Sequence, residues 1–286
     1  MNPRLAAAAA AAAAVLVLAP VAGCSSAGTT PKAAAPGGSG YWTRHRLLGA
    51  GGFWHGHRAP LPSPGSTPTP RQDAHAPRVG ALFDSDSSGD HFCTASVVDS
   101  TAGNVLITAA HCINSGTGGA NQSNVVFIPN YANGNSPNGV WTPERYVIDP
   151  RWVNNADPDL DVAFIVLKPL NGKSIQDVLG ANQIAFNDGF EHLVRVAGYP
   201  DSGSAPISCV NWTSQQSPTQ LQFNCADFTG GTSGSPWITN FNPLTRSGTI
   251  IGVIGGYQEG GNTPSVSYAA YLDGDIQKLY NEANSG

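Results

Sequence analysis

Short apolar runs separated by turn residues fill the chain from Val79 to its end. The runs recur about every ten residues, and glycine, proline, asparagine and serine gather between them. This spacing is typical of antiparallel β-structure, and it predicts a barrel or a sandwich. The expected strands are 79–83, 92–98, 105–110, 140–148, 160–167, 193–198, 207–213, 221–225, 235–239, 249–254 and 266–272.

Two local patterns stand apart from this strand series. In 273–284, Ile276, Leu279 and Tyr280 fall on one face at helical spacing, which predicts a short C-terminal helix capped by Asp273 or Asp275. The stretch 84–89 imitates the first half of a calcium loop. It lacks the acid at the twelfth position, where Ala95 stands, and it lies between expected strands, so we interpret it as a solvated hairpin turn.

The first 24 residues have the features of an export signal. Arg4 precedes an unbroken apolar run, 5–18, which is long enough for the core of a signal peptide but short for a membrane span. Small residues then lead into Cys24, as in the bacterial lipobox, where the cysteine is lipidated and becomes the first residue. An ordinary signal peptide with an incidental Cys24 is the alternative.

Residues 25–78 are predicted to be a linker or a pro-segment. They are rich in alanine, glycine, proline, serine and threonine, a composition typical of an extended, solvated spacer. A tether from a membrane anchor and a removable pro-segment both fit. Trp42, Phe53 and Trp54 indicate some docking against the body, and the histidines at 55–57 are interpreted as solvated rather than as a metal site.

The composition narrows the class of protein. Charged residues make up only 12% of the 286 positions, which suits a loop-rich β protein better than a helical bundle. The formal net charge is -5 and there is no Lys/Arg run, which argues against nucleic-acid binding. Setting Cys24 aside leaves an even set of cysteines, typical of disulfides in an exported chain: Cys93, Cys112, Cys209 and Cys225.

A serine lies between glycines in the stretch 230–237, just before an apolar run. Glycines permit positive φ angles and leave the backbone N–H groups of Gly231 and Ser233 uncovered. Two such N–H groups converging beside a serine hydroxyl are what acyl transfer needs to hold a developing oxyanion. Taken alone, a stretch of this composition is more often a plain loop.

Two upstream stretches add to the serine motif. An apolar strand ends in His111-Cys112, and Asp161 leads straight into the apolar run 162–167. The order His, Asp, Ser and the motifs 108–112 (TAAHC), 161–164 (DVAF) and 231–236 (GTSGSP) resemble the chymotrypsin-like (trypsin-fold) serine protease family. The resemblance covers the chain from about Val79 to the C-terminus.

This resemblance implies an all-β fold of two antiparallel six-stranded barrels with the active site in the cleft between them. The first barrel, 79–175, would supply His111 and Asp161. The second, 176–286, would supply Ser233 and would carry the C-terminal helix packed on it. The resemblance also pairs Cys93 with Cys112. Cys209 and Cys225 flank a turn, so we expect them to close a hairpin that leads into the serine loop.

In the implied mechanism Ser233 is the nucleophile and His111 the general acid and base, with Asp161 orienting the imidazole. Gly231 and Ser233 would form the oxyanion hole. Asp157 and Asp159 compete for the acid role, but they flank a proline and are expected to be solvated turn residues. Asp161 is preferred because the adjoining strand fixes its position.

Several departures bear on activation and specificity. Thr232 stands where chymotrypsin and trypsin have the acid that pairs with a newly freed N-terminus, so we expect no activation of that kind. The serine motif is closer to the bacterial branch that contains the glutamyl endopeptidases, but Ile254 stands where that branch has a histidine, so cleavage after glutamate is not supported. The specificity pocket depends on a further residue. Asp227, six residues before Ser233, either lies on the floor of this pocket and favours Arg or Lys, or points to solvent. Bordering that pocket, we expect backbone for an extended substrate at Gly255, Gly256 and Tyr257.

The sequence therefore predicts an exported serine endopeptidase, secreted or held at the outer face of the membrane by a lipid on Cys24. It should act on peptides or proteins as a monomer, without a metal or other cofactor. A surface binding module that keeps the fold without activity is the main alternative. An esterase on the same scaffold would differ only in its substrate.

Overall fold

A computed structural model describes residues 40–52 and 67–285 of the chain. All of these residues belong to one compact unit, Ala33–Gly286. In this described part, no helix combines the length and the apolar character needed to cross a membrane. Outside it lie the predicted signal peptide, Cys24, Phe53, Trp54 and the histidines at 55–57.

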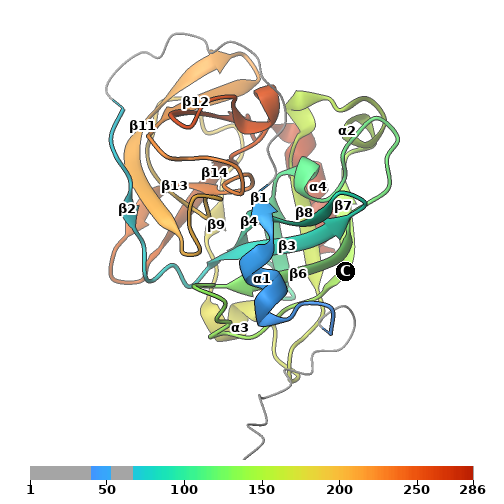
Figure 1. Ribbon diagram of the computed structural model, residues 1–286. Helices are drawn as coiled ribbons and strands as arrows, with labels where there is room; N and C mark the ends of the chain where they lie inside the picture. The colour runs from blue at the N-terminus through green and yellow to red at the C-terminus, as the bar shows by residue number, and fades with distance from the viewer. Residues whose placement is uncertain (1–39, 53–66, 286) are drawn as a thin grey trace, which may run out of the picture. The chain divides into compact units, whose positions relative to one another are not determined.

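The first sheet follows the hydrogen-bonded order β6-β3-β4-β5-β8-β7. Figure 1 labels β3, β4, β6, β7 and β8 of this sheet. Every neighbouring pair on this path is antiparallel. A bridge between Phe127 and Trp141 joins β6 to the segment before β7, so the two ends of the path meet. The strands are β3 (Val79–Asp86), β4 (Gly89–Val98), β5 (Val105–Thr108), β6 (Ser123–Pro129), β7 (Pro143–Ile148) and β8 (Ala163–Leu167), with β1 (Gly51–Gly52) added in parallel to β4.

The second sheet follows the order β15-β12-β11-β10-β13-β14, again with antiparallel neighbours. The N–H of Gly255, just after β14, donates to Tyr268 O on β15 at 3.0 Å and so brings the ends of this path together. The strands are β10 (Leu193–Gly198), β11 (Ile207–Ser217), β12 (Gln220–Asn224), β13 (Pro236–Asn242), β14 (Ser247–Val253) and β15 (Val266–Ala270). Two short strands extend the sheet, β2 (Arg71–Gln72) beside β11 and β9 (Gln183–Ile184) beside β14.

These two paths confirm the predicted all-β fold of two antiparallel six-stranded barrels. Every residue of β5 and β8 is buried. Both sides of these strands are covered, because one hydrophobic cluster joins Leu106 and Phe164 of the first barrel to Ile250 and Val253 of the second. The barrels therefore pack directly against each other along the strands that lead to His111 and away from Asp161.

The sequence prediction lacks β6 and the short helices. These helices are α1 (Arg44–Gly49), α2 (Pro150–Asn155) and α3 (Ile175–Leu179). Each begins at a side-chain cap and has a single buried residue: Asp149 accepts from the N–H of Arg151 at the start of α2, and Ser174 caps α3 in a capping box. Such short elements show no periodicity that a reading of apolar positions would detect.

The predicted C-terminal helix is α4 (Gly274–Asn284), and Asp273 caps it. Its position differs from the expectation, because α4 packs on the first barrel and not on the second. The Tyr280 ring lies 5.7 Å from that of Phe164 on β8, and Arg145 of β7 donates to the carbonyl of Glu282 at 3.1 Å. The apolar face of the helix is buried where the first barrel offers aromatic and aliphatic partners.

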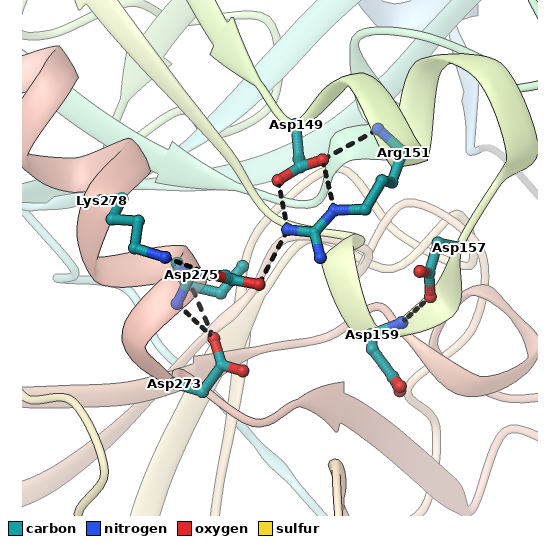
Figure 2. Close-up of polar contacts among 8 residues, drawn as sticks. Asp149, Arg151, Asp157, Asp159, Asp273, Asp275 and Lys278 are labelled. Atoms are coloured by element: carbon teal, nitrogen blue, oxygen red, sulfur yellow. Dashed lines mark hydrogen bonds and ion pairs between the residues drawn. The ribbon is translucent and has the colours of Figure 1, made fainter.

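An ion-pair cluster ties the start of α4 to the first barrel. Figure 2 shows the Arg151 guanidinium between the carboxylates of Asp149 and Asp275, each 2.8 Å away. Lys278 of α4 approaches the other oxygen of Asp275 at 2.7 Å. Arg151 is half exposed, so these pairs orient the helix more than they stabilise it.

Both expected disulfides are present. Cys93 of β4 pairs with Cys112, next to His111, and Cys209 of β11 pairs with Cys225, just after β12. The first disulfide holds the histidine segment against β4. The second closes the β11–β12 hairpin from which the chain continues to the serine loop.

Part of the predicted linker is docked on the first barrel. Trp42 is buried, its ring lies 5.3 Å from that of Phe83, and its indole N–H donates to Asn124 O at 2.6 Å. Leu47 of α1 is buried in the same hydrophobic cluster. The indication of docking from Trp42 is therefore confirmed.

The stretch 84–89 is only partly the solvated turn that the sequence predicts. Asp86 and Gly89 bound an exposed turn, and the N–H of Ser88 donates to Asp86 Oδ1 at 2.6 Å. Asp84, however, is fully buried within β3. Side chains alternate along a strand, so Asp84 shares the face of Leu82, which belongs to the core of the first barrel.

Candidate active site

His111 lies where the buried strand β5 ends and a single 3-10 turn, Ala110–Cys112, begins. Its side chain is only 3% exposed, and the disulfide at Cys112 fixes the turn. The apolar run that ends in this histidine therefore carries an ionisable ring into a site shielded from water.

Asp161 is fully buried between the 3-10 turn Pro158–Leu160 and strand β8. Its Oδ2 accepts from His111 Nδ1 at 2.8 Å and from the Gly256 N–H at 2.8 Å. Its Oδ1 accepts from the His111 N–H at 2.9 Å. A buried carboxylate is costly unless its oxygens are hydrogen-bonded, and here both are. These contacts fix the proton of His111 on Nδ1 and leave Nε2 as the basic atom.

The pKa of His111 lies above its ordinary value of 6.5. Burial alone would lower this pKa, because it disfavours the charged imidazolium. The negative charge of Asp161 and its hydrogen bond outweigh burial and raise the pKa overall. The pair therefore makes His111 a stronger base than an isolated histidine.

The two competing acids have other roles. Asp157 accepts from the N–H of Asp159 at 3.1 Å and so caps the turn before Asp161 (Figure 2). Asp159 accepts from Gln220 Nε2 at 2.7 Å. Both are half-buried turn residues, and the hydrogen bonds to His111 come from Asp161.

The serine loop lies against the end of β5. Gly234 has φ of 80°, and a Cβ atom there would meet Thr94 O at 2.1 Å and Thr108 Oγ1 at 2.2 Å, so only glycine fits. Its neighbour Ser233 is 8% exposed. Since Thr108 lies three residues before His111, this close backbone packing brings Ser233 beside the histidine segment. Within the described residues, no hydrogen bond joins the Ser233 hydroxyl to His111, and such bonds often tighten only when substrate binds.

The expected oxyanion donors are uncommitted. In the described part of the chain, the N–H groups of Gly231 and Ser233 donate to no protein oxygen, although both residues are buried. Thr232 between them turns its hydroxyl to Thr229 O at 2.7 Å. A hydrogen bond within the loop therefore holds Thr232, and the buried N–H groups of Gly231 and Ser233 stay available.

The residues expected to border the specificity pocket have their N–H groups bonded within the protein, and their place beside a substrate stays a prediction. The N–H groups of Gly255, Gly256 and Tyr257 donate to Tyr268 O, Asp161 Oδ2 and Gln220 Oε1. None of the three is left to donate to a substrate strand. The Gly256 N–H instead donates to Asp161. The sequence does not predict this hydrogen bond, because it comes from a backbone group across the junction of the two barrels.

Asp227 is exposed in a left-handed turn, with φ of 62°. A carboxylate on the floor of a pocket that selects Arg or Lys would be buried. The structure therefore favours the solvent-facing alternative, and the argument for a basic preference through Asp227 does not hold.

One dense group of possible metal ligands occurs among the described residues, Cys93, His111 and Cys112. Both sulfur atoms are joined in the disulfide, so neither can bind a metal as a thiolate. The residues around His111 thus fit proton transfer better than metal binding.

The trypsin family model matches residues 68–273. Protease Anisep from Arthrobacter nicotinovorans is 28% identical with a TM-score of 0.68, over 76% of this chain and 100% of that one. The thermostable serine protease AL20, from an extremophilic microorganism, is 32% identical with a TM-score of 0.68, over 74% and 99% of the two chains.

A more distant structure, a Glu endopeptidase in complex with MPD, is 14% identical with a TM-score of 0.60, over 77% of this chain and 98% of that one. At that identity the likeness shows the fold alone. The search among curated proteins gives no match. Because the trypsin model spans well over half of the 286 residues, and AL20 is matched over nearly its whole length, the chain belongs to the trypsin family of chymotrypsin-fold serine proteases.

Proposed function

We propose that this chain is a serine endopeptidase that cleaves peptide bonds through an acyl-enzyme at Ser233. The observation that carries the proposal is the buried Asp161–His111 pair, with 2.8 Å between Oδ2 and Nδ1. This pair lies beside a serine loop that presents two uncommitted N–H groups. A general base, its orienting carboxylate and oxyanion donors are the parts that acyl transfer by serine requires.

In the first half of the reaction, Ser233 Oγ attacks the carbonyl carbon of the scissile bond and its proton passes to His111 Nε2. The N–H groups of Gly231 and Ser233 stabilise the charge that develops on the carbonyl oxygen. The C–N bond then breaks, and the leaving amine takes the proton from His111. Asp161 stays ionised and keeps the imidazole in the required orientation.

In the second half, a water molecule attacks the Ser233 ester and His111 Nε2 takes its proton. The bond between the acyl carbon and Oγ breaks, and the proton returns to Oγ. The products are the regenerated serine and a new carboxylic acid, which ionises by releasing its proton to water. Protons and electron pairs balance within the protein, the peptide and water.

The test is a peptide-library cleavage profile of the purified chain beside Ser233→Ala. Loss of the nucleophile should lower turnover about a million-fold. Ser235→Ala is the matched control, because Ser235 is also buried in this loop and its hydroxyl has no hydrogen-bond partner among the described residues. That variant should keep activity within about threefold, because removing the Ser235 hydroxyl breaks no hydrogen bond in the loop.

Other outcomes separate the alternatives. Absence of both cleavage and Ser233 labelling by a fluorophosphonate, in folded protein, would identify an inactive binding module. Turnover of simple esters without turnover of amides would identify an esterase. The profile also measures the side-chain preference, for which the exposed Asp227 gives no direction.

We also propose that the protein is exported as a monomer and anchored through Cys24. The sequence of the first 24 residues supports the export and the anchor. Metabolic labelling with a radioactive fatty acid should mark the wild-type chain and not Cys24→Ser, whereas equal labelling of both would contradict a lipid at that cysteine.

A further inference from the structure

Every polar atom of Thr94 is hydrogen-bonded, and two of them, the N–H and the hydroxyl, join the first barrel to the serine loop. Thr94 is fully buried on β4. Its N–H donates to Ser233 O at 2.7 Å and its hydroxyl donates to Gly231 O at 3.0 Å. The same hydroxyl accepts from the Tyr199 N–H at 3.0 Å, and the Thr94 carbonyl accepts from Thr108 Oγ1 at 2.8 Å.

The two carbonyls held by Thr94 alternate with the two N–H groups assigned to the oxyanion hole. These carbonyls lie in the planar peptide groups 231–232 and 233–234. The two groups flank the one that carries the Ser233 N–H, and the first also adjoins the one that carries the Gly231 N–H, so holding them limits the rotation of both donors. Gly231, with φ of 86°, has no side chain to restrict its backbone, and a Cβ there would meet Phe92 Cε2 at 2.2 Å. Its conformation must therefore be set by contacts from outside the residue.

Thr232 supplies the opposing contact. Its N–H and hydroxyl both point to Thr229 O, at 3.2 and 2.7 Å. The peptide between Gly231 and Thr232 is thus held on one side by the loop itself and on the other by the Thr94 hydroxyl. Releasing the Thr94 side would let this peptide rotate.

We propose that Thr94 is a positioning residue of the oxyanion hole, acting through the hydrogen bond from its hydroxyl to Gly231 O. This inference rests on the proposed function of Ser233. The hydroxyl touches no reacting atom. It keeps the N–H groups of Gly231 and Ser233 directed at one point. Thr232, which lies between these two residues, is uncharged and takes part through its hydrogen bonds to Thr229 O.

The contact should matter most in the transition state, when charge appears on the carbonyl oxygen. Removing a whole oxyanion donor costs about 100- to 1000-fold in kcat, so misaligning one should cost about 10- to 100-fold. Ground-state binding does not use that charge. KM should therefore change by less than about threefold.

The experiment compares Thr94→Val, which keeps the shape and removes the hydroxyl, with Thr94→Ser, which keeps the hydroxyl. Thr213→Val is the matched control. Thr213 is also a buried threonine whose hydroxyl donates to a carbonyl, Phe190 O at 2.7 Å, and accepts from an amide, the His192 N–H at 2.9 Å. Its site on β11 is remote from Ser233 in the hydrogen-bond network.

Steady-state kinetics on one peptide substrate give kcat and KM for each folded variant. The proposal predicts a selective fall in kcat for Thr94→Val, near wild-type values for Thr94→Ser, and no selective fall for Thr213→Val. An equal effect of the two valine substitutions, or failure of serine to restore kcat, would overturn it. If Thr94→Val does not fold, Thr94→Cys takes its place, and its weak S–H donor should give an intermediate loss.

A second readout does not need activity. Hydrogen exchange of the Thr232 and Gly234 amides should be about tenfold faster in Thr94→Val than in Thr213→Val, because a loosened loop opens more often. Unchanged exchange would refute the positioning role. If the wild type proves inactive while this exchange difference is present, the proposed function fails and the hold of Thr94 on the loop stands.

Discussion

Two buried aspartates of the first barrel differ in whether their oxygens are hydrogen-bonded. Asp161 and Asp84 are both fully buried. The oxygens of Asp161 accept hydrogen bonds from His111 and Gly256, whereas neither oxygen of Asp84 has a hydrogen-bond partner among the described residues. Burial raises the pKa of Asp84 to about 8, and the charges of Asp86 and Asp90 add to this rise. Asp84 is therefore protonated in the folded protein at neutral pH.

Asp84 should make stability fall as pH rises. Between its unfolded pKa of 3.8 and its folded pKa of about 8, unfolding releases the proton that the folded state retains. The free energy of unfolding should fall by about 1.4 kcal/mol per pH unit in this window and level off above it. Asp84→Asn should remove this slope, as measured by urea denaturation from pH 5 to pH 8.

Asp86→Asn is the control for that measurement. Burial would raise the pKa of Asp86, but hydrogen bonds from Ser88 and His91 outweigh it and lower the pKa. Asp86 is thus ionised in both states across the window, so its substitution should leave a slope, which ends at a lower pH because the charge of Asp86 no longer raises the pKa of Asp84. A slope that persists in Asp84→Asn would show that Asp84 does not titrate as described.

The raised pKa of His111 sets the acid limit of activity. His111 must be neutral to accept the proton of Ser233, so kcat/KM should fall as pH decreases through an apparent pKa above 6.5. Asp161→Asn should lower that pKa and reduce kcat on the order of 10⁴-fold, because the imidazole loses its orienting charge. Asp159→Asn removes a nearby carboxylate bound to Gln220 and should leave the apparent pKa in place. An acid limb below 6.5 in the wild type would contradict the pairing.

At the scale of elements, short segments with fixed ends place the reactive groups. The histidine turn, the aspartate turn and the serine loop each join a buried strand to irregular backbone. The two disulfides close loops of similar sequence separation, 19 residues for Cys93–Cys112 and 16 for Cys209–Cys225. Only the first adjoins a residue of the proposed triad.

The two disulfides should therefore contribute alike to stability and differently to activity. Replacing either pair by alanine should lower the free energy of unfolding by about 3 kcal/mol, since the closed loops are similar. Loss of Cys93–Cys112 should also lower kcat at least tenfold in protein that is still folded, because the turn of His111 is released; one misplaced group costs about that much. Thermal denaturation and kinetics on both double variants check this, and equal kcat values would refute it.

At the scale of the whole molecule, the described part of the predicted linker is docked on both barrels: residues 40–52 lie on the first, and β2 pairs with β11 of the second. β1 pairs with β4 at His91 and Phe92, and the Phe92 ring lies close to Gly231. Trp42 supplies the main apolar contact of this segment.

Trp42→Ala should release the segment 40–52 from the barrel. Amide exchange there should approach that of an unprotected chain, while β5 and β8 keep their protection, because the loss is local. Leu48→Ala is the control, since Leu48 is 48% exposed in the same helix and its removal should change exchange little. Hydrogen exchange by mass spectrometry measures both variants, and protection of 40–52 in Trp42→Ala would show that other contacts hold the segment.

The all-β class was predictable because its determinants are local, whereas the two-barrel arrangement was implied by the resemblance to the chymotrypsin-like family. Apolar runs of strand length, turn residues between them and a capped helical pattern at 273–284 each reflect neighbouring positions in the chain. The choice of Asp161 over Asp157 and Asp159 also came from local sequence, since a strand follows it directly. The docking of α4 was not predictable in this way, because the pattern of Ile276 and Leu279 shows that a face is buried and not against which barrel.

The sequence by itself determined the all-β class, the order of the three motifs, an even set of cysteines and the site of the C-terminal helix in the chain, and the family resemblance added the pairing of Cys93 with Cys112. Only the tertiary structure decided that Gly256 holds Asp161, that Thr94 holds Gly231, that Asp84 is buried and that Asp227 is exposed. Hydrogen bonds between the two barrels join residues far apart in the sequence, and no local pattern of residue types predicts them. The burial of one aspartate likewise depends on strands distant in sequence. The chemistry of the site is therefore encoded locally, and its alignment is set by contacts between the barrels.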